Sequence, residues 1–140
     1  LMKELQLGFR ICQLARFIHQ DMTQLLLPYG LTPEQWVVVQ RVAEQAGLSQ
    51  RQLSQRLKKD ENTVKGMVDR LCKKDILVRQ VNPKDRRQFC LSLTEEGQVL
   101  HEKLQALDLA AQGHWQEELS DQEALELSIL LSRLEATFEK

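Results

Sequence analysis

The 140-residue sequence lacks the features that mark several common protein classes. Its three cysteines, Cys12, Cys72 and Cys90, show no CxxC spacing, which argues against a disulfide framework or a zinc site and favours a reducing, cytoplasmic location. The three histidines have no metal-ligand spacing either, so we expect no metal or other cofactor. Apolar runs are only a few residues long, whereas a membrane span needs about 18. We therefore expect neither a membrane segment nor a signal peptide.

Signals of catalysis are missing as well. The sequence contains no glycine-rich phosphate-binding loop and neither the GxSxG nor the HExxH motif of hydrolases. The histidines fall on segments expected to be helical, where no nucleophile is evident as a partner. We therefore do not expect an enzyme.

The chain does have a strongly uneven distribution of charge. Residues 1–50 contain four basic and four acidic residues, whereas residues 51–87 contain twelve basic and five acidic ones, a net charge of +7. Residues 94–140 contain three basic and eleven acidic residues, a net charge of -8. Charge scattered over a solvated surface does not predict such blocks. The basic block indicates a surface that faces a polyanion.

Apolar spacing and capping residues predict the order of the elements. The segments 32–35, 49–52 and 120–123 each have the pattern of a capping box, whose first and last side chains satisfy backbone N–H groups at a helix start. Asp60 is expected to cap a further helix, and alternating apolar residues indicate a later hairpin. The predicted helices cover residues 3–27, 33–47, 49–57, 60–74, 94–115 and 120–138, and the predicted strands cover residues 77–81 and 88–93.

This order predicts a mainly α fold with a small β-hairpin wing. Two short capped helices followed by a hairpin are typical of a winged helix-turn-helix, here over residues 32–93, whose second short helix enters the DNA major groove. The terminal helices, residues 1–27 and 95–140, carry apolar stripes that one small lobe does not cover. Pairing with a second copy buries these stripes and supplies the symmetry that a palindromic DNA site requires. We therefore expect a single domain with a dimerisation arm.

The predicted recognition helix and its neighbours carry candidate DNA-binding residues. Asn and Thr side chains can hydrogen-bond base edges, and Lys and Arg can contact phosphates or guanine. The alternative is a solvated helix face held by pairs of Asp69 with Lys65 and with Lys73; the capped helix before it and the basic hairpin after it favour DNA. The candidates are Ser49, Arg51, Gln52, Asn62, Thr63, Lys65, Gly66, Arg70, Lys73, Lys84, Asp85, Arg86 and Arg87.

The hairpin tip concentrates basic charge around one acidic residue. Arg86 or Arg87 can enter a narrow minor groove, where the negative potential is focused. Asp85 is expected to hold an arginine by a bidentate pair and so fix its direction. The alternative is an Asn-Pro turn whose charges keep an edge strand soluble, but charge of nearly one sign favours contact with DNA.

Residues 48–97 strongly resemble the MarR (multiple antibiotic resistance regulator) family of bacterial transcription factors, and they read LSQRQLSQRLKKDENTVKGMVDRLCKKDILVRQVNPKDRRQFCLSLTEEG. The family's wing pattern is Asp-x-Arg, a short spacer and Leu-Thr-x-x-Gly, matched here by Asp85, Arg87, Leu93, Thr94 and Gly97. The resemblance implies a homodimer with two winged lobes on a palindromic double-stranded operator. It also implies a repressor that a small, often phenolic, ligand releases.

Carried over by position, Thr63 matches the family's recognition-helix Ser/Thr, and Arg87 matches its wing-tip arginine. The chain departs from the family at Gly66, where a basic residue is common, so Lys65 is a candidate substitute. It also departs at Asp75, where the family usually has glycine. Asp75 should therefore take the left-handed conformation that ends a helix, which aspartate tolerates at some cost.

The control of DNA binding has two candidate forms, a small ligand and a reactive cysteine, and DNA binding itself has one alternative. Phe9, Cys12 and Trp36 are candidates to line a pocket for a small aromatic ligand, although aromatics at helical spacing are more often core residues. One branch of the family senses organic hydroperoxides through a cysteine placed like Cys12, whereas a buried cysteine is more commonly a small packing residue. A winged-helix module that binds protein in place of DNA is the remaining alternative, against which the basic block argues.

Overall fold

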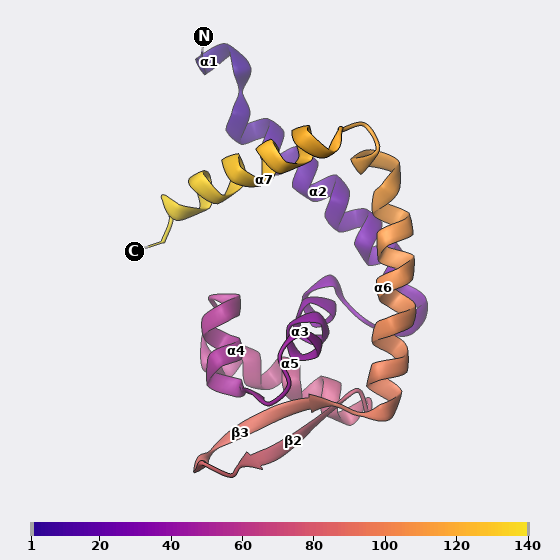
Figure 1. Cartoon of the computed structure of the whole chain (residues 1–140), viewed down its shortest axis with the longest axis vertical. Helices are drawn as coiled ribbons and strands as arrows, with labels where there is room; N and C mark the ends of the chain where they lie inside the picture. The colour runs from indigo at the N-terminus through magenta and orange to yellow at the C-terminus, as the bar shows by residue number, and fades with distance from the viewer. Residues whose placement is uncertain (1, 140) are drawn as a thin grey trace. The chain divides into compact units, whose positions relative to one another are not determined.

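The computed structural model describes residues 2–139 and divides into two compact units, with the boundary in the chain between Gln105 and Ala106. None of the helices in this described part is long and apolar enough to cross a membrane. The helices are α1 (Met2–Leu5), α2 (Leu7–Leu26), the 3-10 helix η1 (Leu27–Tyr29), α3 (Pro33–Glu44), α4 (Gln50–Leu57), α5 (Glu61–Lys73), α6 (Glu95–Gln116) and α7 (Asp121–Ala136). The strands are β1 (Leu48–Ser49), β2 (Leu77–Asn82) and β3 (Asp85–Leu93) (Figure 1).

The predicted fold, mainly α with a hairpin wing, is confirmed, with differences in detail. The second predicted helix ends at Glu44, three residues before its predicted end. The first predicted helix is interrupted at Gln6, which has φ 50°, and nothing in the sequence explains this break. β3 begins earlier than predicted, because Asp85 already pairs with Asn82 across the turn. A third strand was missed: β1 pairs with β3 in a sheet of order β1-β3-β2, and its two residues are too few to show an alternating pattern.

Local side-chain chemistry explains the helix ends. The three predicted capping boxes, at 32–35, 49–52 and 120–123, are all present with both reciprocal hydrogen bonds. Asp60 caps α5, as predicted. After α5, Asp75 has φ 59°, the left-handed conformation expected from its replacement of glycine. Each of these features depends on residues a few positions apart.

The core of the first unit lies among α3, α4, α5 and the sheet. Trp36 from α3 is 1% exposed, and Leu53, Val64 and Leu91 from the other elements are fully buried. Leu104, near the end of this unit on α6, is buried as well. This packing fixes α4 and α5 against the sheet, from which the β2–β3 hairpin, here called the wing, projects (Figure 1).

The terminal helices keep large apolar side chains exposed in the single chain. On α2 the exposed fraction is 57% for Leu14 and 51% for Phe17, and on α7 it is 50% for both Leu130 and Leu134. No residue of α7 is buried among the described residues. The full set on these two helices is Leu7, Phe9, Ile11, Leu14, Phe17, Leu125, Leu127, Ile129, Leu130, Leu131 and Leu134.

Candidate nucleic-acid interface

The start of α5 is shaped by the cap that Asp60 provides. The carboxylate accepts a hydrogen bond from the Thr63 backbone N–H at 2.7 Å and another from the Thr63 hydroxyl at 2.9 Å. These two bonds hold the pKa of Asp60 below its usual range. Because the hydroxyl proton is used locally, the Thr63 side chain is left with oxygen lone pairs and no donor.

The exposed side of α5 presents most of the predicted recognition-helix residues. Its opposite side is buried through Val64, Met67, Val68 and Leu71. At Gly66 no atom beyond the helix's own backbone and the adjacent residues lies within 4 Å of where a Cβ would stand, so the helix surface is open at that position. The exposed polar and basic side chains are Asn62, Thr63, Lys65, Arg70 and Lys73.

Two of the predicted α4 residues serve chiefly as caps. The hydroxyl of Ser49 accepts the Gln52 N–H at 3.0 Å, and the Gln52 Oε1 accepts the Ser49 N–H at 3.0 Å. Ser49 is only 5% exposed. The side chains of both residues are thus engaged at the helix start, and Arg51 beside them is the exposed basic residue of this turn.

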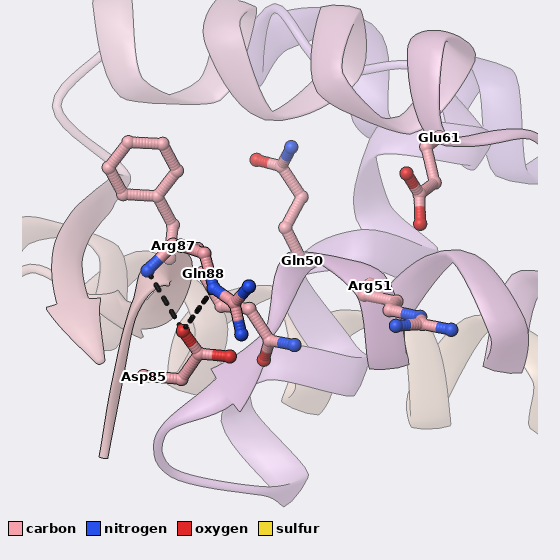
Figure 2. Close-up of a pocket in the computed structure, with 7 residues that line it drawn as sticks. Gln50, Arg51, Glu61, Asp85, Arg87 and Gln88 are labelled. Carbon is pink, nitrogen blue, oxygen red and sulfur yellow. Dashed lines mark hydrogen bonds and ion pairs between the residues drawn. The ribbon is translucent and has the colours of Figure 1, made fainter. Parts of the chain in front are cut away.

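A surface cleft of about 450 Å³ joins α4, α5 and the wing. Figure 2 shows side chains from the starts of α4 and α5 and from β3 around it. Four of the lining residues were not predicted from the sequence; Gln50 and Glu61 directly follow the predicted caps, a position that could have pointed to them. The lining residues are Gln50, Arg51, Glu61, Asp85, Arg87, Gln88 and Phe89.

The wing tip contains the predicted pairing of Asp85 with Arg87, in a different geometry. A single carboxylate oxygen of Asp85 accepts both the Arg87 backbone N–H, at 3.1 Å, and its Nε–H, at 3.2 Å (Figure 2). The expected bidentate pair is therefore wrong, because residues two apart on one strand bring Nε, and not the outer fork, to the carboxylate. The Arg87 side chain is 91% exposed.

Asp69 also differs from its expected role on a solvated face. Its carboxylate lies 2.6 Å from Nη1 of Arg79 on β2. The hydrogen bond from Arg79 is the main cause that lowers the pKa of Asp69. The structure therefore places Asp69 in a contact between α5 and β2, and Lys65 and Lys73, its partners in the alternative of a solvated face, act on the pKa of Asp69 only as weaker charges.

The three candidate ligand-pocket residues lie in different surroundings. Trp36 is a core residue whose ring contacts that of His101 in a tilted arrangement, with the centroids 5.6 Å apart. Its indole N–H is buried and has no hydrogen-bond partner within the described part of the chain. Phe9, 67% exposed, and Cys12 lie on the surface of α2 in the single chain.

A capped helix pair, a short sheet and a basic wing beside the second helix define a winged helix-turn-helix protein. Comparison with known proteins gives the family. Residues 31–89 match the model of the MarR family. The putative transcriptional regulatory protein for the hcr operon of Thauera aromatica is 30% identical over 131 residues, which cover 92% of this chain and 78% of that protein. The chain belongs to the MarR family of transcriptional regulators.

Two further relatives match over most of their length. The HTH-type transcriptional repressor MdtR of Bacillus subtilis is 29% identical, over 96% of this chain and 85% of that protein. The crystal structure of CouR from Rhodococcus jostii, bound to p-coumaroyl-CoA, is similar with a TM-score of 0.84 and 28% identity, and the match covers 91% of this chain and 90% of that one. The similarity therefore extends beyond the winged lobe to the terminal helices.

Proposed function

We propose that this transcriptional regulator is a non-enzymatic, homodimeric repressor that binds a palindromic double-stranded operator in the bacterial cytoplasm. The observation that carries the proposal is the cleft between α4, α5 and the wing, with exposed Arg51 and Arg87 on two of its sides. α5 is the element proposed to enter the major groove, and Arg87 is proposed to reach the flanking minor groove. The +7 charge of residues 51–87 supports binding to phosphates.

The exposed apolar faces of α2 and α7 support the homodimer. Burying apolar surface contributes about 25 cal/mol per Å², so leaving side chains such as Leu14 and Leu134 half exposed forgoes a large stabilisation. A second copy of the chain offers the same apolar faces, and two-fold symmetric contact buries both sets at once. The same symmetry places two winged lobes on the two halves of a palindrome.

A small aromatic effector is supported by Trp36 and by one relative. The buried indole N–H of Trp36 has no partner among the described residues, and such a donor is satisfied when an acceptor group binds beside it. The relative CouR was crystallised bound to p-coumaroyl-CoA. We propose that an aromatic acid or its derivative releases the operator. Thiol sensing by Cys12 has weaker support: a reactive thiol needs an electropositive neighbour, and the guanidinium of Arg16, one turn further along α2, lies over the ring of Phe17 at 5.9 Å.

Selection of bound duplexes from a random pool tests this function. We expect an inverted repeat whose half-site centres lie about 10–10.5 base pairs, or a multiple of this, apart. Enrichment of a single, non-repeated site would contradict the two-fold arrangement. A pool with no enrichment, together with weak and salt-insensitive binding, would favour a protein-binding module.

A further inference from the structure

Arg79 on β2 lies at the junction of the elements that form the proposed DNA-binding surface. Its guanidinium pairs with Asp69 of α5 at 2.6 Å, and its Nε donates to Oε1 of Gln50 at the start of α4 at 3.1 Å. Nη2 donates to the backbone carbonyl of Lys65 at 3.4 Å. The guanidinium carbon also lies 5.8 Å from the ring centroid of Phe89 on β3. One side chain thus contacts both helices and both wing strands.

The sheet register explains how one residue reaches so many elements. Arg79 is opposite Leu91 of β3, and Leu91 is opposite Leu48 of β1. Gln50 follows β1 directly, so a long side chain from β2 extends across β3 to the start of α4. Arg79 is 22% exposed, and three of its N–H groups are directed at protein acceptors. This leaves little of the guanidinium available to a phosphate.

The planar fork of arginine suits this position better than any other cation. Its five N–H donors lie in one plane at fixed directions, so bonds to three partners fix the partners relative to one another. A lysine offers one ammonium group on a flexible stem and cannot hold a carboxylate, an amide and a carbonyl in fixed directions. The contacts of Arg79 therefore constrain the angle between α5 and the wing.

We propose that Arg79 is a positioning residue that sets the wing against the recognition helix, so that both meet one half-site in register. This inference rests on the proposed function of operator binding. It assigns Arg79 an effect on discrimination between sequences without a contact to DNA. Asp69 is its main partner, and the two act as one unit.

The test uses the full-length chain and two fluorescent duplexes, the selected operator and a scrambled sequence of equal length, at fixed salt. Arg79→Gln should weaken operator binding by about tenfold or more, which is the scale of a lost hydrogen bond to a charged group. It should weaken binding to the scrambled duplex far less. Arg41→Gln is the matched control, because Arg41 also pairs with a carboxylate, at 2.9 Å, but within α3 alone. It should change both affinities by less than about twofold.

Two further readouts separate positioning from other roles. The salt slope of operator binding should be unchanged in Arg79→Gln; a slope lower by about one per subunit would show a phosphate contact and overturn the inference. Asp69→Asn combined with Arg79→Gln should be no worse than Arg79→Gln alone, whereas additive losses would contradict a shared unit. The titrations use conditions under which circular dichroism shows that each variant is folded. If Arg79→Gln does not fold, Arg79→Lys, which keeps the charge, should show the same loss of discrimination.

The outcomes distinguish the inference from the proposed function. If the parent protein binds no duplex, both the proposed function and the inference are contradicted. If the parent binds the operator selectively and the Arg79→Gln variant is equally selective, only the inference is contradicted.

Discussion

Replacing Gly97 with alanine tests how closely the helix after the wing packs against the start of β2. A Cβ at Gly97 would stand 2.1 Å from the carbonyl oxygen of Ile76 and 3.0 Å from its carbonyl carbon. Both are backbone atoms, so no side chain can rotate to make room. The same oxygen accepts the Thr94 N–H at 3.0 Å. Alanine therefore has to push α6 away from β2 and break this hydrogen bond.

The cost can be worked from these contacts. Forcing a methyl group into a packed site costs about 1–3 kcal/mol, and a lost hydrogen bond adds about 1 kcal/mol. We expect Gly97→Ala to lower the free energy of unfolding by about 2–4 kcal/mol, out of the roughly 5–15 kcal/mol of a typical domain. Urea unfolding followed by circular dichroism, at one protein concentration, should show the midpoint lowered by about 1–2 M.

Gly66→Ala is the matched control, because it makes the same chemical change in the middle of α5. Apart from the backbone of its own helix turn and its chain neighbours, no atom lies within 4 Å of the added methyl group there. Alanine has the higher helix propensity, so this variant should be more stable than the parent by about 0.5–1 kcal/mol. A Gly97→Ala protein that unfolds at the parent's midpoint would refute the close approach to Ile76.

Four more predictions concern DNA binding and the recognition helix. Asp85→Ala should weaken operator binding although it removes a negative charge, because Arg87 loses the oxygen that orients it; tighter binding in an anisotropy titration would mean that the wing is only a charged patch. Lys84→Ala should weaken binding to all duplexes alike and reduce the salt slope of binding by about one per subunit. A loss of affinity that depends on the DNA sequence would contradict a phosphate contact. Low doses of organic hydroperoxide should leave operator binding unchanged, and a stoichiometric loss that Cys12→Ser abolishes would show that we are wrong. The folded pKa of Asp60 is lowered, so its stabilisation is present above the ordinary aspartate pKa and lost as the pH falls through the lowered one. Asp60→Ala should therefore destabilise the protein at neutral pH, and urea midpoints of parent and variant should converge in acid.

Features that depend on neighbours in the chain could be predicted from the sequence. The capping boxes at 32–35, 49–52 and 120–123 need only two residues three positions apart, and all three are present. The left-handed conformation of Asp75 was expected from the glycine that the MarR family usually has at this helix end, and the structure confirms it. The alternation of apolar and polar residues along β3 likewise predicted the wing.

Features that depend on packing between distant elements could not be predicted. The pairing of Asp69 with Arg79 joins a helix to a strand, and nothing in the local pattern distinguishes Arg79 from the other basic residues of its block. β1 exists because Leu48 and Ser49 meet β3, more than forty residues later in the chain. The residue-level roles of the proposed DNA contacts remain predictions.

Anisotropy titration of the selected operator over a range of potassium chloride concentrations tests the central claim most directly. We expect two chains per duplex, a steep fall in affinity with salt, and operator binding about 10³-fold or more tighter than binding to a scrambled duplex. Equal affinity for the two duplexes, or an affinity that does not change with salt, would contradict sequence-specific binding through the basic surface of α4, α5 and the wing.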